Sequence, residues 1–314
     1  MSDAKAVILD HRGLLRIGGA DRVDFLQGIV SNDVAQVSAG RTVWSAFLTP
    51  QGKFLHEFFL AAEGAAGGAA EGTAEGETFL LDCEAERRAD LARRLKLYKL
   101  RSQVTVEDAS EDYAVAALFG DDALAKLGLA EEPGTTASFG GGLAFVDPRL
   151  ARLGARAILP KAGAAAALTE AGFTEASLED YDRRRIAAGA PDGSRDMEVE
   201  RSILLENGFD ELHGVDWDKG CFMGQELTAR TKYRALIKKR LLPVEIEGPL
   251  PETGSAVTRD GKNAGVLRSV VAGEGGTALG LALLRLDSLG ERYDAPLMAG
   301  DAKVTARKPD WAEF

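Results

Sequence analysis

Short hydrophobic runs separated by polar turns dominate the first hundred residues and indicate a sheet-rich fold. Residues 43–48 and 54–60 are rich in apolar and aromatic side chains, and residues 50–53 between them have the composition of a turn. Before them, Asp21 precedes Val23, Phe25 and Leu26, whose spacing leaves an apolar stripe. The pattern therefore predicts two strands joined by a tight turn, with a helix on their N-terminal side.

The pattern continues as an alternation of strands and helices. Residues 7–9 and 11–17 predict two short strands around a turn, and residues 78–83 predict another strand. Residues 85–98 have helical spacing of Leu91, Leu95 and Tyr98. Further segments are expected as strands at 104–106, 115–118, 140–147 and 155–159 and as helices at 122–127, 162–172 and 178–186. This alternation favours an α+β architecture.

Two stretches depart from that alternation. Residues 61–77 are almost entirely Ala, Gly and Glu, with too little apolar bulk to offset backbone entropy, so we expect a mobile hairpin insertion. After residue 240 the chain changes to short apolar stretches broken by Gly, Pro, Asp and Glu, which predicts a small all-β module. We therefore expect two regions, residues 1–240 and residues 241–314.

Composition narrows the functional classes. The chain has 314 residues and a net charge of −11, which argues against general nucleic-acid binding. The N-terminal residues include no basic leader and no long apolar segment, so we expect a cytoplasmic protein without a membrane anchor. A processed organellar protein would have the same N-terminal features. Its 2 cysteines and 3 histidines are too few and too dispersed for a resident iron-sulfur cluster or another metal site.

One of the two cysteines lies in a segment suited to expose a thiol. Cys221 stands between Gly220 and Gly224, which permit backbone angles closed to other residues, so we expect a loop there. Cys83, within an apolar run, is expected to be buried. Lys219 precedes the loop, and His213 lies further upstream, either as a base for the thiol or, as we favour, as a turn residue.

A basic segment follows the cysteine. Residues 230–240 contain six lysines and arginines, beginning with Arg230, and no acidic residue. Such a segment would favour the thiolate if it lay near Cys221, or would bind an acidic partner. A solvated helix face is the alternative, and Glu226 can equally serve to cap the helix that follows it.

The segment from Lys219 to Glu226, Lys-Gly-Cys-Phe-Met-Gly-Gln-Glu, resembles the hallmark of the YgfZ family, relatives of the T-protein of the glycine cleavage system. Further matches lie at residues 204–207, 213–215, 227–231 and 238–241, and weaker ones at 25–33, 49–53, 265–269 and 281–285. The block at 204–241 is most similar to the branch that contains the mitochondrial iron-sulfur assembly factor.

The resemblance implies a three-lobed α+β architecture, with two ferredoxin-like units around a folate-type pocket and a C-terminal β-barrel. It also implies a role in assembly or repair of iron-sulfur proteins, with carrier or client proteins as partners of a monomer. Cys221 would be the reactive group and Lys219 would tune it. The residues expected around a cofactor are Asn32, Gln51, Gln225, Glu226 and Arg230.

Two other functions remain open at this point. One is a folate-dependent aminomethyltransferase, but His56-Glu57 stands where those enzymes carry an acidic pair, and they lack the cysteine hallmark. Ala187 also replaces the glutamate that holds the pterin, which weakens the prediction of tetrahydrofolate as a cofactor. The other is a non-enzymatic adaptor that docks a cluster carrier while Cys221 lends a transient ligand. Whether any turnover occurs is left open.

Overall fold

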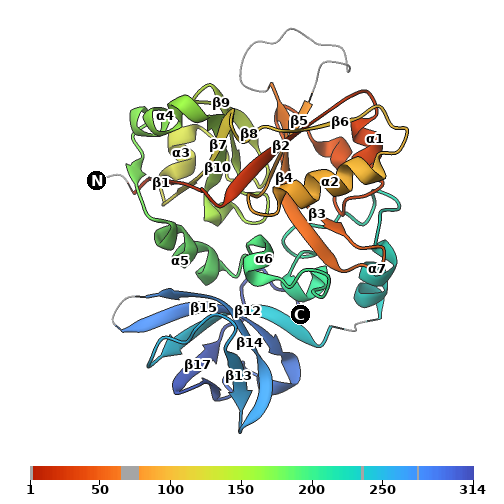
Figure 1. The fold of residues 1–314 in the computed structure, drawn as a ribbon. Helices are drawn as coiled ribbons and strands as arrows, with labels where there is room; N and C mark the ends of the chain where they lie inside the picture. Colours follow the sequence, from red (N-terminus) through yellow and green to blue (C-terminus); the bar gives the residue numbers. More distant parts are fainter. Residues whose placement is uncertain (1–2, 65–77, 235–236, 274–275) are drawn as a thin grey trace. The chain divides into compact units, whose positions relative to one another are not determined.

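A computed structural model describes residues 3–64, 78–234, 237–273 and 276–314 (Figure 1). The chain divides into two compact units. The first unit comprises Met1–Leu48, His56–Leu178 and His213–Met223. The second comprises Thr49–Leu55, Glu179–Leu212 and Gly224–Phe314. Each unit thus brings together segments that are far apart in the sequence.

The first unit contains a five-stranded sheet with the order β3-β4-β5-β2-β6. Its strands are β2 (Arg12–Gly18), β3 (Val43–Leu48), β4 (Phe54–Glu63), β5 (Thr78–Glu84) and β6 (Thr105–Asp108). Every residue of β3 is buried, and all of them except Ser45 are apolar. Helix α2 (Arg88–Tyr98) buries Leu91 and Leu95, one turn apart, and Tyr98 packs edge-on against Phe47. The strands and the helix predicted here are confirmed.

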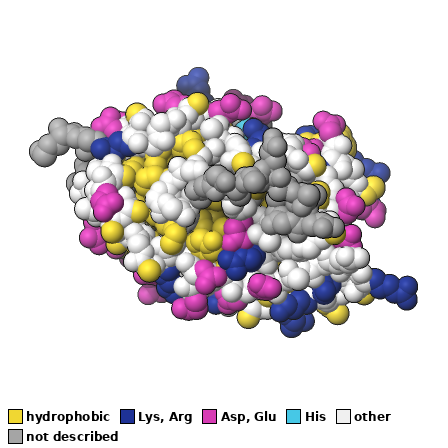
Figure 2. Space-filling view, turned by 90° about the horizontal axis from the view of Figure 1, so that it is seen from above, with side chains coloured by type: hydrophobic (Ala, Val, Ile, Leu, Met, Phe, Trp, Pro, Cys, Tyr) yellow, Lys and Arg dark blue, Asp and Glu magenta, His cyan; other side chains and the backbone are white. Residues whose placement is uncertain are grey.

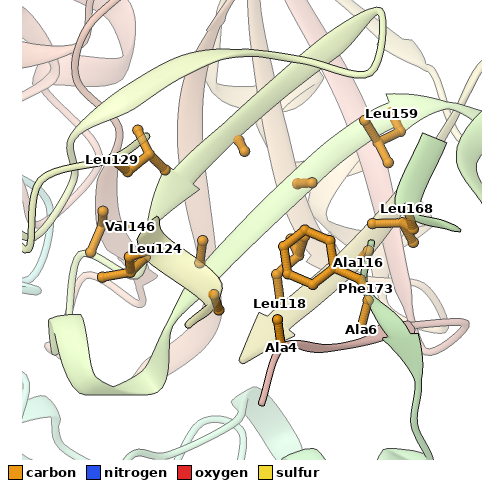
Figure 3. Close-up of a cluster of buried hydrophobic side chains, with 14 of the residues drawn as sticks. Ala4, Ala6, Ala116, Leu118, Leu124, Leu129, Val146, Leu159, Leu168 and Phe173 are labelled. Atoms are coloured by element: carbon orange, nitrogen blue, oxygen red, sulfur yellow. The ribbon is translucent and has the colours of Figure 1, made fainter. Parts of the chain in front are cut away.

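A six-stranded sheet, with the order β11-β1-β7-β10-β9-β8, completes the strands of the first unit. Its strands are β1 (Lys5–Ile8), β7 (Tyr113–Phe119), β8 (Thr136–Phe139), β9 (Gly142–Val146), β10 (Ala155–Pro160) and β11 (Thr174–Glu175). Small side chains on the strands make room for larger ones from the flanking segments: Phe173 lies beside Ala116 and Leu118 of β7 in the buried cluster of Figure 3. Helices α3 (Ala123–Leu127) and α4 (Ala164–Glu170) contribute Leu124 and Leu168 to it. Small and large side chains therefore fill the core of this sheet together.

The N-terminal strands form as predicted, yet they belong to different sheets. β1 pairs with β7, whereas β2 pairs with β5 and β6. The insertion expected at residues 61–77 begins inside β4, which pairs Glu63 with Thr78 of β5. Residues 65–77 lie outside the described residues, so the mobility of the insertion stays a prediction.

The first unit also contains short helices. They include α1 (Arg22–Gln27) and the short 3₁₀ helices η1 (Val34–Gln36), η2 (Ala151–Leu153) and η3 (Lys161–Gly163). The predicted helix after Asp21 is confirmed, although the Asp21 side chain makes no capping hydrogen bond. Instead, an Asp21 carboxylate oxygen accepts the backbone N–H of Gln103 at 2.7 Å. Asp21 therefore joins the start of α1 to a distant loop.

The second unit contains a closed six-stranded barrel. The short apolar stretches that follow residue 240 predicted this all-β module. Its strands are β12 (Lys239–Glu247), β13 (Ala256–Arg259), β14 (Lys262–Ala272), β15 (Thr277–Arg285), β16 (Leu297–Ala299) and β17 (Ala302–Ala306). Leu242, Val244 and Ile246 of β12 belong to the cluster of side chains inside the barrel. Leu241 of the same strand packs instead with Ile186 in a second cluster. The period-2 pattern of β12 thus separates the two faces of the strand.

The remaining elements of the second unit are short helices. They are α5 (Leu178–Ala188), α6 (Gly193–Asp196), η4 (Leu204–Asn207), α7 (Gln225–Tyr233) and η5 (Leu286–Ser288). The fully buried Arg185 guanidinium of α5 donates to Asp182 at 2.5 Å, to Asp196 at 2.8 Å and to Ser269 at 3.0 Å. One side chain thereby links α5, α6 and β14. None of the described helices has the length and apolar character needed to cross a membrane.

Charges of both signs are mixed on the face seen in Figure 2. Among the described residues of that face, acidic and basic side chains lie next to one another around an area of hydrophobic side chains. This distribution differs from the uniformly basic surface on which nucleic-acid binding depends.

Candidate functional site

The predicted thiol segment is a loop with its cysteine exposed. Residues Lys219–Met223, here called the thiol loop, precede α7 and belong to the first unit. Cys221 is exposed and Cys83 is buried, which confirms both predictions. Burial raises the pKa of the Cys83 thiol far above its ordinary value. Of the two cysteines, Cys221 alone presents its sulfur to solvent.

Lys219 anchors the N-terminal end of the thiol loop. Its Nζ donates to the carbonyl oxygens of Val30 and Asn32, both at 2.6 Å. The same nitrogen lies 5.4 Å from the centre of the Phe222 ring. Desolvation lowers the pKa of Lys219 to about 8, although Asp33 and Asp216 act in the opposite direction. The ammonium group therefore points into the fold rather than to solvent.

Further hydrogen bonds hold the main chain of the loop. An Asp216 carboxylate oxygen accepts the backbone N–H groups of Asp218 at 2.8 Å and Lys219 at 3.0 Å. The Gln27 side-chain amide donates to the Lys219 carbonyl at 3.4 Å. At the other end, the Met223 N–H donates to the Gly28 carbonyl at 3.1 Å. The loop is thus attached to the segment after α1 on both sides of Cys221.

Between these attachments the loop is exposed to solvent. Gly220 has a φ of 94°, and a Cβ placed there would meet no atom within 4 Å among the described residues. Glycine is needed here for its backbone angle, not for lack of space. Phe222 is buried, whereas Gly220 and Cys221 are exposed. The thiol stands on the exposed side of a loop whose flanking residues point inward.

Sequence reasoning missed Gln27 and Asp216 as supports of this loop. Gln27 also accepts from the Val34 N–H at 2.8 Å and donates to Asp33 at 2.8 Å. Asp216 receives a hydrogen bond from the Gln36 amide at 2.9 Å. Gln27 falls within residues 25–33, one of the segments that resemble the family. That resemblance could have indicated a role for Gln27. Asp216 had no comparable signal.

Asn32 supports the loop from below and lines a cavity. Its side-chain amide donates to the carbonyl oxygens of Trp44 and His213, both at 2.7 Å, and its Oδ1 accepts the Asp33 N–H at 2.9 Å. A cavity of about 320 Å³ lies beside it, with Trp44, His213 and Asp216 in its wall. Both amide hydrogens of Asn32 are already donated to main-chain carbonyl groups, so the side chain connects the backbone at Trp44 to the backbone at His213. A cofactor contact of Asn32 stays a prediction.

His213 is a turn residue, as favoured from the sequence. Its φ is 59°, and residues 211–213 form a turn. The carbonyl of His213 accepts from Asn32, and the residue belongs to the wall of the cavity. His213 therefore forms a backbone turn that accepts a hydrogen bond from Asn32.

The other predicted cofactor residues belong to the second unit. Gln51 is exposed in the turn before β4, and Gln225 begins α7. The turn packs against α7, because a Cβ on Gly52 would come within 2.7 Å of Leu227 and 2.8 Å of the Gly224 carbonyl. Gln51 and Gln225 thus lie on adjoining elements. Their binding role stays a prediction.

The basic segment is partly neutralised by its own unit. Arg230 donates to Glu226 at 2.5 Å, one turn earlier on α7. Lys232 pairs with Asp210 at 3.2 Å, and Arg240 pairs with Glu211 at 3.0 Å. Glu226 also places a negative charge in the first turn of the helix, although the helix has no side-chain cap. This arrangement favours the helix-face interpretation for part of the segment, and residues 235–236 lie outside the described residues.

His56 and Glu57, which we compared with the acidic pair of the transferases, are buried and have partners inside the fold. Glu57 accepts from Arg12 at 2.5 Å and from the Trp44 indole at 2.6 Å. His56 contacts Asp90 at 3.1 Å. Burial and the nearby Arg87 lower the pKa of His56 to about 4, so the imidazole is neutral at pH 7. These contacts leave neither side chain poised for proton transfer to a bound substrate.

The described residues fit a folate poorly at the position that the resemblance singles out. Ala187 lies exposed on α5 and has no side-chain acceptor for a pterin edge. We therefore derive no step through tetrahydrofolate. Metal-ligand geometry is also missing from the described part of the chain, where no three His, Cys, Asp or Glu side chains are grouped to hold a metal ion.

Comparisons with known proteins agree with this architecture. A family model described as the CAF17 C-terminal beta-barrel domain matches residues 238–314. A solved structure of the glycine cleavage system aminomethyltransferase T from Bartonella henselae has a TM-score of 0.75 and 16% identity. It covers 99% of this chain and 87% of that chain. This likeness confirms the predicted α+β fold of the T-protein type with its C-terminal barrel, and it concerns the fold alone.

Curated relatives match nearly the whole sequence. The mitochondrial iron-sulfur cluster assembly factor IBA57 of Mus musculus is 36% identical over 326 residues, covering 96% of this chain and 84% of the relative. The protein of the same name from Homo sapiens is 33% identical, with the same coverage. Their names place these relatives in mitochondria, so the expectation of a cytoplasmic protein is contradicted.

Proposed function

Because the chain belongs to the family of the iron-sulfur cluster assembly factor IBA57, we propose that it assists the assembly or repair of iron-sulfur proteins through Cys221. Its partners would be iron-sulfur carrier or client proteins. The proposal assigns Cys221 the role of a thiol that contacts iron or sulfur on a partner. Lys219 is assigned a positioning role.

The observation that carries this proposal is the anchoring of the thiol loop. Cys221 is exposed, while Lys219 and Met223 are hydrogen-bonded to the segment after α1 on either side of it. A thiol held in this way reaches a partner without losing much conformational freedom on contact. Such preorganisation is what a docking ligand requires.

The number of thiols supports a transient contact. Iron-sulfur clusters are usually held by four cysteine thiolates, whereas Cys83 is buried and leaves Cys221 as the single accessible donor. The remaining ligands would come from the partner or from a cluster carried by it. When the Cys221 thiol binds iron, it does so as the thiolate and releases its proton to solvent.

The aminomethyltransferase alternative has less support. Glu57 is engaged by Arg12 and Trp44, and His56 is held neutral beside Asp90. The solved aminomethyltransferase shares the fold at 16% identity, and a shared fold does not establish a shared reaction. We therefore place the function in the thiol loop and not in this buried pair.

The test is complementation of a cell that lacks the native gene. We expect Cys221→Ser to leave the activities of cluster-dependent enzymes at the level of the uncomplemented cell, because serine is a poor iron ligand. Cys83→Ser is the matched control and should restore activity if it folds, which circular dichroism would check. Full restoration by Cys221→Ser would overturn the thiol role.

A binding measurement separates the thiol role from simple docking. The purified chain would be mixed with a cluster-loaded carrier at low and high salt. Association that is salt-sensitive and unaffected by Cys221→Ala would indicate an adaptor held by charge. Loss of cluster-dependent association in that variant would support the thiol role.

A further inference from the structure

A pocket on the barrel of the second unit has an unusual charge. It has a volume of about 430 Å³ and is formed by β12, β14 and β15 together with residues 198–206. Its wall contains four cationic and two acidic side chains: Arg201, Lys239, Arg268, Arg285, Glu198 and Glu206. In a chain with a net charge of −11, this excess of positive charge is local to the pocket.

Two of the cations face each other across neighbouring strands. Lys239 of β12 is directly opposite Arg285 of β15 in the antiparallel register. Like charges at such positions repel, which destabilises the pair unless an anion lies between them. Asp287 offsets Arg285 through contacts of 3.1 and 2.6 Å. Lys239, by contrast, forms no ion pair with the described residues, although its charge acts on Glu206 of the same wall.

Arg268 adds a third cation with unused donor capacity. Its side chain is 15% exposed, and one terminal nitrogen contacts Glu198 at 2.9 Å. Its Nε is buried and has no hydrogen-bond acceptor among the described residues. Guanidinium groups pair readily with oxyanions through two N–H groups. Arg268 is therefore partly neutralised but not saturated.

Glu206 is an acidic wall residue with an altered environment. Desolvation raises its pKa, although Lys239, Lys53 and Arg240 act against this shift. No hydrogen bond reaches its carboxyl group from the described part of the chain. The Glu206 carboxyl group is therefore an acidic component of the wall, beside the cationic groups that would bind an anion.

The pocket also has an apolar side. Val266 and Leu283 belong to its wall, and they are opposite each other in the register of β14 and β15. Gly265 precedes Val266, and a Cβ there would lie 2.3 Å from the Leu283 carbonyl, so the backbone approaches closely. Ligand sites typically combine such apolar contacts with a few polar groups, in volumes of roughly 300–1,000 Å³.

We propose that this pocket binds a small organic oxyanion, a carboxylate or a phosphate ester, through Lys239 and Arg268, with its apolar part on Val266 and Leu283. This site is distinct from Cys221 and does not depend on the proposed role of the thiol. Carboxylate and phosphate share the recognition chemistry, and the experiment distinguishes them.

The test is calorimetric titration of the full chain with citrate and with glycerol 3-phosphate, at an ionic strength held constant with sodium chloride. We expect saturable binding of one of the two anions. Lys239→Gln and Arg268→Gln should each weaken that binding about tenfold or more, because each removes a charge-assisted contact. Lys303→Gln, which removes a barrel lysine outside the pocket, should leave affinity unchanged.

Two further controls keep the result interpretable. Cys221→Ser should bind the anion as the wild type does, so that loss of the thiol function and loss of this site are separable. Circular dichroism would establish that Arg268→Gln is folded, and the exposed Lys239 provides a variant with little effect on packing. No saturable heat with either anion, or wild-type affinity in the folded pocket variants, would overturn the proposal.

Discussion

Two cations of the first unit, Arg12 and Lys219, show different ways of placing charge inside a fold. Arg12 is buried and meets carboxylates: its guanidinium contacts Glu57 at 2.5 Å and Asp82 at 2.6 Å. Lys219 is half-buried, and its hydrogen bonds go to two uncharged carbonyl groups. The first arrangement neutralises charge, whereas the second leaves a cation whose protonation costs desolvation.

The two arrangements serve different purposes: one stabilises the fold, and the other holds the Cys221 loop in position. Asp82 also contacts Arg156 at 2.9 Å, so its carboxylate is shared by two buried guanidinium groups and joins β2, β5 and β10. The Lys219 anchor instead joins a loop to the segment after α1 and holds Cys221 in position. The buried network therefore maintains the sheets, while the lysine anchor maintains the site.

The largest effect is expected from breaking the buried network. Asp82→Asn would leave two guanidinium groups without their shared negative charge, and should lower the free energy of unfolding by about 3–5 kcal/mol. Urea unfolding, followed by tryptophan fluorescence, measures it. The matched control is Glu111→Gln, which breaks an exposed pair with Lys161 at 3.2 Å and should cost less than about 1 kcal/mol. Equal losses in the two variants would contradict the contrast.

A smaller effect is expected from stiffening the thiol loop. Gly220→Ala should cost about 1 kcal/mol, because alanine is strained at a φ of 94° although its Cβ has open space. Gly163→Ala is the control, since that glycine has equally open space but a φ of −120°. Thermal unfolding of both variants would compare them. A loss of stability in Gly163→Ala as large as that in Gly220→Ala would show that backbone angle is not the cause.

A third effect is a change of slope with pH at Lys219. Its pKa is about 8 in the folded chain, below the ordinary value of 10.5. Between pH 8 and 10.5, Lys219 is protonated in the unfolded chain but deprotonated in the folded chain. The contribution of Lys219 to the free energy of unfolding therefore rises with pH in this window, and it is lowest below about pH 8. Lys219→Met and Lys219→Arg should both lack this rise, since methionine cannot titrate and arginine stays charged.

Denaturant unfolding at several values between pH 7 and 10 would reveal the slope. Lys219→Arg retains donors for the carbonyls of Val30 and Asn32, so it separates titration from loss of the anchor. A wild-type slope identical to that of both variants would mean that Lys219 does not titrate in this window.

Local features of the sequence predicted the exposure of Cys221, the burial of Cys83 and the turn at His213. Glycine neighbours, an apolar run and a Leu-His-Gly sequence are sufficient for those expectations because each depends on nearby residues. The strands at 43–48 and 54–60 were predictable for the same reason. The resemblance to a known family supplied the T-protein architecture, which residue patterns alone did not establish.

Long-range contacts were beyond such reasoning. Lys219 meets the carbonyls of Val30 and Asn32, groups that carry no side-chain signal and lie far away in the sequence. Asn32 was expected at a cofactor, but the fold uses its amide to connect main-chain segments. The barrel pocket depends on the register that places Lys239 opposite Arg285, which composition does not reveal.

The attachment of the thiol loop to the segment after α1 has a consequence for biosynthesis. The N–H of Met223 reaches the carbonyl of Gly28, and the ammonium of Lys219 reaches that of Val30, so early and late parts of the polypeptide must meet before the loop is held. A nascent chain emerging from the ribosome cannot hold Cys221 in this way until residues 213–223 have been synthesised and have reached the segment after α1. Anchoring of the thiol is therefore coupled to near-completion of the first unit.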